Sequence, residues 1–341
     1  MEALQERREM SAWGASGGDG GIDDPRRFVI GASEEAQIST LCQIAKHNGS
    51  VLNLSELIDA TSMPTNEEEL QVAWGTNPTL SSRYSLEAGW IVEKDWGSSG
   101  VEGAVERANW SRARSAWNIA QAVDFARLCV HGEVRLLAVS GGNSYDRAGP
   151  ADDVDLFCVT NKDSMWLFML RSLLLARAFR LLRRRTAPFC FSYVVEEERV
   201  RDDFARKEGG LFARDALMAR VVHGQGFYGR LLRESPWMGA YFPTLYSKRA
   251  GEAVATEPQG AGPRRRGGLR AAANSFLFYT VGSYIKLKAY FLNGKYRRVG
   301  NISAVFRADI GKDRCVYESN RYRRLRRMYD GPLPARSGER A

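Results

Sequence analysis

The stretch Leu136–Thr160, LLAVSGGNSYDRAGPADDVDLFCVT, combines a short apolar run, a glycine turn and two aspartates. The apolar run Leu136–Val139 stops at Gly141 and Gly142. This pattern is typical of a buried strand that ends in a turn whose backbone comes close to another group. Backbone N–H groups in such a turn can hold phosphate oxygens. The stretch therefore predicts a strand and turn that can bind an anionic ligand.

The second half of this stretch predicts a pair of carboxylates on one face of a strand. Strand period two puts Asp153 and Asp155 on one face, with Val154 and Leu156 on the other. Like charges so close repel each other and raise each other's pKa, so they need a cation or water around them. Hard oxygen ligands suit Mg²⁺ or Mn²⁺. The alternative is an edge strand with two solvated acids.

Together, these residues match the signature of a known superfamily. An apolar strand, a Gly-Gly turn, about ten residues and then Asp-x-Asp in a second apolar strand resemble the DNA polymerase beta-like nucleotidyltransferases; the matching residues are Gly141, Gly142, Asp153 and Asp155. The run from about 32 to 243 is also similar to a group of prokaryotic, largely uncharacterised nucleotidyltransferase-domain proteins with a small N-terminal winged-helix-like region. The resemblance implies an α/β (α+β) fold in which helices flank a mixed sheet.

The resemblance also implies a reaction. A nucleoside monophosphate would pass from a nucleoside triphosphate to an acceptor hydroxyl, and pyrophosphate would leave. Asp153 and Asp155 would be catalytic residues that bind Mg²⁺. The residues expected to hold the phosphates are Gly141, Gly142, Asn143 and Ser144. Asp152 lies next to the pair but would point to the opposite face, where it would be solvated or would support the turn.

A third carboxylate is the missing part of the signature. Members of the superfamily take it from a strand that follows a helix; here Asp163-Ser164 is expected to cap that helix, and 188–195 is the matching strand. Its period puts Cys190, Ser192 and Val194 on one face, so Ser192 holds the expected position. Serine cannot act as a base, and Glu196 at the strand end is the candidate base. The alternative is a non-catalytic nucleotide-sensing or DNA-binding regulator that keeps the fold.

Composition leaves several partners open. The chain has 341 residues, 44% of them hydrophobic and 26% charged, which is enough for two compact domains. Its net charge of +9 permits a polyanionic partner, so a nucleotide, RNA or DNA all remain possible. Arginines gather at 177–185 and at 321–327, where the alternative interpretation is a solvated helix end.

Cysteine usage and hydropathy favour the cytoplasm. The five cysteines lie far apart without a Cys-x-x-Cys motif, and they predict buried thiols rather than a zinc motif or a disulfide framework. The apolar stretches 166–182 and 275–292 are interrupted by arginine or lysine, so no membrane span is expected.

The expected organisation has five parts. They are a disordered tail at 1–27, a winged-helix-like domain at 30–98, a nucleotidyltransferase domain at 105–250, a linker at 251–272 and a helical C-terminal extension at 273–330. In the second part, three helices precede a hairpin of two short strands, which is the winged-helix order. The third helix begins with Glu67, Glu68 and Glu69, which repel phosphate, so packing or partner binding is favoured over DNA reading.

Overall fold

A six-stranded mixed sheet forms the larger part of the molecule. The computed structural model describes residues 28–47, 50–87, 89–150, 152–183, 186–206, 209–254 and 268–329, so the expected tail at 1–27 lies outside them. The strand order is β7-β4-β5-β6-β9-β8. The strands are β4 (Val134–Ser140), β5 (Val154–Thr160), β6 (Phe189–Glu196), β7 (Arg220–His223), β8 (Phe306–Ile310) and β9 (Arg314–Ser319). Only β5 and β6 pair in parallel within this sheet, because helix α7 (Met165–Leu182) carries the chain back between them.

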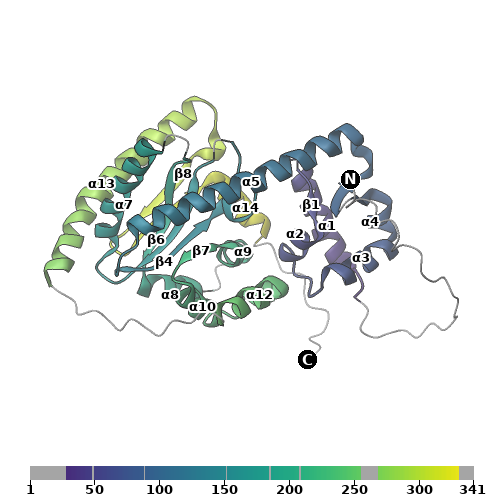
Figure 1. Cartoon of the computed structure of the whole chain (residues 1–341), viewed down its shortest axis with the longest axis horizontal. Coiled ribbons are helices and arrows are strands. Elements are labelled where there is room, and N and C mark those ends of the chain that lie inside the picture. Colours follow the sequence, from purple (N-terminus) through teal and green to yellow (C-terminus); the bar gives the residue numbers. More distant parts are fainter. Residues whose placement is uncertain are drawn as a thin grey trace, which may run out of the picture.

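Helices cover both faces of the sheet, which confirms the expected α/β class (Figure 1). On one face, α7, α5 (Ser98–Cys129) and α13 (Gly268–Arg298) bury Phe125, Trp166 and Ile285 against the strands. The other face is covered by α8 (Glu197–Ala205), α9 (Gly210–Met218), α10 (Gln225–Arg233), α11 (Met238–Tyr241) and α12 (Pro243–Val254). None of the helices in the described part of the chain is long and apolar enough to cross a membrane.

The C-terminal segment belongs to the sheet, which corrects the expected helical extension. After α13, strands β8 and β9 form a hairpin, and β9 pairs with β6 through Tyr193 and Val316. Helix α14 (Asn320–Tyr329) follows. The runs 306–310 and 314–319 are short and contain charged residues, so their strand character was not visible beside the basic helix after them. Of the expected linker at 251–272, the first residues extend α12, the last begin α13, and 255–267 lie outside the described residues.

The N-terminal unit contains the three expected helices and the hairpin, together with further elements. It comprises α1 (Ala32–His47), β1 (Leu52–Asn53), α2 (Leu54–Asp59), α3 (Glu67–Thr76), α4 (Pro78–Arg83), β2 (Tyr84–Glu87), β3 (Trp90–Glu93) and η2 (Lys94–Trp96). Strand β3 pairs antiparallel with both β1 and β2. Ile38, Leu57 and Leu70 are fully buried in its core. The winged-helix assignment remains a prediction.

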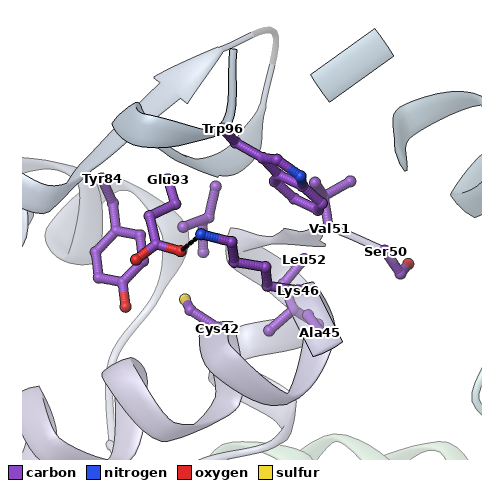
Figure 2. Close-up of a pocket in the computed structure, with 10 residues that line it drawn as sticks. Cys42, Ala45, Lys46, Ser50, Val51, Leu52, Tyr84, Glu93 and Trp96 are labelled. Carbon is purple, nitrogen blue, oxygen red and sulfur yellow. Dashed lines mark ion pairs between the residues drawn. The ribbon is translucent and has the colours of Figure 1, made fainter. Parts of the chain in front are cut away.

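A cavity in this unit is too small for a ligand. It lies between Cys42, Tyr84 and Trp96, and the ion pair of Lys46 Nζ with Glu93 Oε2, 2.7 Å long, lies beside it (Figure 2). Its volume is about 10 Å³, which is room for about one water molecule. The cavity is therefore a packing gap.

Helix α5 joins the two parts of the molecule. Its first half buries Ala104 and Ala108 against the N-terminal unit, and its second half buries Phe125 and Cys129 against the sheet (Figure 1). A single helix thus fixes the N-terminal unit beside the end of β4, where the glycine turn lies.

Candidate metal and phosphate site

The glycine turn contacts the aspartate strand directly. Strand β4 ends at Ser140, and the single helical turn α6 (Gly141–Ser144) follows. Gly141 has φ +64°, a backbone conformation that side chains disfavour. A β-carbon on Gly141 would lie 2.5 Å from Asp155 Oδ2, so only glycine fits there. The turn and the carboxylate are therefore one structural unit.

Asp153 and Asp155 lie together, as the strand period predicts. Asp155 pairs with Ser140 across the antiparallel β4–β5 ladder. Val154 and Leu156 are buried in the core on the α5 side, so the two aspartates face the opposite side of the sheet. Asp155 is half-buried and Asp153 is exposed. A half-buried and an exposed carboxylate can thus share a ligand that enters from solvent.

Cys190 is the third member of the cluster, and the sequence interpretation missed it. It is the register partner of Asp155 on the parallel strand β6. Its sulfur and one carboxylate oxygen each from Asp153 and Asp155 all lie within 4.8 Å of one another. The cysteine was visible in the sequence, but only the pairing of β5 with β6 places it beside the aspartates.

A β-bulge explains the orientation of β6. This strand has one extra residue just beyond the pairing of Cys190 with Asp155. Ser192 donates a hydrogen bond to Asp155, so Cys190 and Ser192 both face the aspartates. After the bulge, Val194 packs in the core on the α5 side and Tyr193 packs on the other face. The expected common face of Cys190, Ser192 and Val194 is therefore wrong for Val194.

Burial and charge repulsion dominate the electrostatics of the cluster. Burial, followed by the charge of Asp153, raises the pKa of Asp155 to about 7. Burial also raises the pKa of Asp153, and burial together with the two carboxylates raises that of Cys190. Among the described residues, no lysine or arginine forms an ion pair with either aspartate. The cluster is thus short of positive charge.

Asn143 and Ser144 hold the turn rather than a ligand. Asn143 Nδ2 donates to the backbone oxygen of Asp153 over 2.8 Å, and its Oδ1 accepts from Asn118 Nδ2 of α5 over 2.7 Å. Ser144 Oγ donates to the backbone oxygen of Gly141 over 2.9 Å. Both side chains are buried and already bonded, which corrects their expected role as phosphate ligands. The backbone of the turn remains as the part that can meet a phosphate.

Asp152 supports the loop before β5. Its Oδ2 accepts a hydrogen bond from the backbone N–H of Gly149 over 2.7 Å. The Asp152 carboxylate therefore closes the loop, in agreement with the expected role in supporting the turn.

Glu196 lies at the far end of the sheet, which corrects its expected role as the general base. It pairs with Thr160, five residues beyond Asp155 along β5, and at about 3.3 Å per residue the separation is roughly 16 Å. Its Oε1 accepts from the backbone N–H of Ser164 over 3.2 Å at the start of α7. Ser164 makes no side-chain cap of its own. The buried Glu196 carboxylate therefore caps α7 in place of the expected Asp163-Ser164 cap.

The loop after the turn makes side-chain contacts with both the sheet part and the N-terminal unit. The Tyr145 hydroxyl donates to Asp215 of α9, and Tyr322 of α14 also hydrogen-bonds Asp215. Arg147 reaches the N-terminal unit, where its Nη2 lies 2.6 Å from Glu56 Oε2 and 2.9 Å from the backbone oxygen of Val51. These contacts join residues far apart in sequence, so no local pattern predicted them.

A basic hollow lies on α14. Arg323, Arg324 and Arg327 line it together with Asn320 and Ile302, and its volume is about 370 Å³. The expected basic C-terminal segment thus forms a surface with arginines on one helix. Such a surface suits an anion more than a cation.

The sequence matches no family model, and neither a curated protein nor a solved structure matches the chain.

Proposed function

We propose that this chain is a nucleotidyltransferase that moves a nucleoside monophosphate from a nucleoside triphosphate to an acceptor hydroxyl. One arrangement supports the proposal most: Asp153 and Asp155 lie together, directly against the Gly141 turn. Among the described residues, no lysine or arginine pairs with their charges. A cation site beside a glycine turn is the pairing that phosphoryl transfer uses.

The roles of the residues follow from their chemistry. Asp153 and Asp155 would hold the cation, and the backbone of Gly141 and Gly142 would hold phosphate oxygens. A bound Mg²⁺ or Mn²⁺ would neutralise charge on the transferred phosphoryl group. Two carboxylates suit either ion. Asn118 and Asn143 would keep the turn rigid while substrates exchange, because their hydrogen bonds are buried.

The proposed reaction lacks an identified general base. Glu196 lies at the far end of the sheet, where it accepts a hydrogen bond at the start of α7. The Asp152 carboxylate accepts a hydrogen bond within its own loop. A positioned base contributes roughly two to four orders of magnitude to a rate. We therefore propose slow turnover, with most of the catalysis coming from positioning and charge neutralisation.

The alternative proposal is a non-catalytic nucleotide-sensing or DNA-binding regulator. It is favoured by the residues of β6 that face Asp155, which are Cys190 and Ser192 rather than a third acid; the superfamily resemblance would place that acid at Ser192. The first turn of α3 is acidic, which argues against DNA contact through that helix. The arginine hollow on α14 is the better surface for RNA, DNA or another polyanionic acceptor.

The proposed location is the cytoplasm. All five cysteines are free thiols, and four of them are buried. Free thiols persist in a reducing compartment.

The experiment that tests the proposal is calorimetry with each common nucleoside triphosphate, with and without divalent cation, followed by transfer assays with labelled triphosphate and cell extract. We expect cation-dependent binding that Asp153→Asn and Asp155→Asn abolish. Asp152→Asn is the matched control, since this acid is adjacent but bonds only its own loop. Binding that ignores a chelator, or that survives both substitutions, would overturn the site. Binding without transfer would favour the regulator.

A further inference from the structure

We propose that Cys190 is the third cation ligand, and that it makes this site prefer a thiophilic divalent ion such as Zn²⁺ or Co²⁺ over Mg²⁺. The inference rests on the proposed cation site at Asp153 and Asp155 and changes which cation occupies it. The Mg²⁺ that the superfamily resemblance implies calls for a third oxygen. The chain offers the Cys190 sulfur there, beside a Ser192 hydroxyl that already donates a hydrogen bond to Asp155.

The geometry of the three donors fits one ion. Sulfur and oxygen ligands lie about 2.0–2.3 Å from a zinc ion, so donors around one ion are on the order of 3.5 Å apart. The Cys190 sulfur and the oxygens of Asp153 and Asp155 already lie within 4.8 Å of one another. Side-chain rotations can close the remaining gap. Two of the donors are set by the β5–β6 pairing, because Asp155 and Cys190 are direct register partners.

The chemistry of the donors sets the preference. Mg²⁺ binds oxygen ligands in octahedral geometry and keeps several waters, so a thiolate is a poor donor for it. Thiolate ligands select Zn²⁺ and other soft or borderline ions. Three protein donors with a further open position are the arrangement of catalytic zinc sites, in which the open position takes water or substrate. The exposed Asp153 leaves the cluster open to solvent for such a ligand.

Cys190 differs from the other cysteines in its surroundings. Cys42, Cys129, Cys158 and Cys315 are all buried, whereas Cys190 is half-buried. Its thiol hydrogen-bonds to the carboxylates of Asp153 and Asp155. The thiol proton thus lies between two groups that are themselves potential anions. On binding, the S–H bond breaks, a sulfur–metal bond forms and the proton passes to buffer, with no change of oxidation state.

The test titrates the metal-free full chain with Co²⁺ and follows the near-ultraviolet charge-transfer absorption that a thiolate–cobalt bond produces. We expect this band to appear, to be displaced by an equimolar amount of Zn²⁺, and to survive a large excess of Mg²⁺. Cys190→Ser should remove the band and lower Zn²⁺ affinity by at least about tenfold, because losing a direct ligand costs no less than losing a partner that only orients one. The matched control is Cys42→Ala, a buried thiol of the N-terminal unit, which should keep the band.

Two further variants keep the test decisive if Cys190→Ser does not fold. Asp153→Asn and Asp155→Asn retain the thiol but should weaken Co²⁺ binding at least tenfold. Cobalt binding without a thiolate band, or a band unaffected by these aspartates, would overturn the inference. The proposed function can fail separately. Mg²⁺-dependent triphosphate binding without any band would sink the inference alone, whereas a band without triphosphate binding would sink the proposed function alone.

Discussion

Gly141 lies against the carboxylate of Asp155, so closely that a β-carbon on Gly141 would be 2.5 Å from Asp155 Oδ2. The glycine also has φ +64°. These two facts give the Gly-Gly signature a physical meaning. The first glycine is needed because it allows the turn and the carboxylate to approach each other. The second glycine faces no comparable obstacle, since its nearest neighbour would be the backbone oxygen of Arg147 at 3.4 Å.

Gly141→Ala should therefore destabilise the protein and displace Asp155, whereas Gly142→Ala should fold normally. Alanine in the left-handed region costs roughly 1–2 kcal/mol, and the collision with Asp155 adds to that cost. Urea unfolding of both variants measures the difference, and Co²⁺ or Mg²⁺ titration measures the displaced carboxylate. Equal stability of the two variants would contradict the role given to Gly141.

The stability of the metal-free protein should depend on pH through Asp155. Burial, followed by the charge of Asp153, raises its pKa to about 7 when folded, whereas an unfolded aspartate titrates near about 3.9. The folded state binds the proton more tightly. The stability contributed by protonated Asp155 is thus fully present below about pH 4 and is lost as the pH rises to about 7.

Asp155→Asn has no such titration, so its stability relative to wild type should rise across that interval. Urea midpoints at about pH 5, 6 and 8, in the presence of chelator, give the comparison. Saturating divalent cation favours the ionised carboxylates and should reverse the difference at the highest pH. A gap between variant and wild type that stays constant with pH would show that Asp155 is not the titrating group.

Glu196 should prove structural. Its carboxylate accepts the Ser164 N–H at the start of α7, so Glu196→Leu should cost about 1–2 kcal/mol of unfolding free energy. Glu196→Gln keeps an oxygen acceptor and should cost less. Thermal unfolding measures both. Triphosphate binding and any turnover should be the same in Glu196→Gln as in wild type, and a loss of roughly two or more orders of magnitude in turnover would return Glu196 to the role of base.

Arg147 should couple the glycine turn to the N-terminal unit. Its Nη2 lies 2.6 Å from Glu56 Oε2, and both side chains are about three-quarters buried. A double-mutant cycle of Arg147→Ala and Glu56→Ala should give a coupling energy of about 1–3 kcal/mol. The exposed pair Arg201–Glu234 is the matched control and should give about 0–1 kcal/mol. Equal couplings in the two cycles would remove the case for a specific connection.

Local sequence patterns predicted the elements that depend only on residues close together in the chain. The alternation around Asp153 and Asp155 and the strand before Gly141 follow from period two and glycine chemistry, and the structure contains both. The hairpin of β8 and β9 was missed because its strands are short and partly charged, and they are stabilised by pairing with β6, which no local signal reports.

The errors at the site have the same origin. Glu196 is near Ser192 in sequence, but β6 runs parallel to β5 and carries it to the opposite end. Asn143 and Ser144 have the chemistry of phosphate ligands, yet both side chains are buried and already donate hydrogen bonds to backbone oxygens of the site. Cys190 faces the aspartates in a register that only strand pairing defines. Sequence spacing indicates which residues share a face of one strand. Strand pairing decides which residues of neighbouring strands lie side by side.

Restoring an acid should identify which position completes the site. Cys190 is the direct partner of Asp155, whereas Ser192 lies beyond it at the bulge and its Oγ is also 3.5 Å from the backbone oxygen of Leu156. Cys190→Asp replaces sulfur with the oxygen that Mg²⁺ prefers. We expect it to raise Mg²⁺ affinity at least tenfold, with a smaller gain for Ser192→Asp.

Calorimetric Mg²⁺ titration of the two variants measures this order, with Cys190→Ser as the uncharged control. A third acid near two others also increases repulsion, so Cys190→Asp should be less stable than wild type without metal and should recover when Mg²⁺ is added. If triphosphate transfer appears only in Cys190→Asp, the native chain is the regulator, and the cysteine is the residue that separates it from an enzyme. If Ser192→Asp gains more Mg²⁺ affinity than Cys190→Asp, the third position of a magnesium site belongs to Ser192.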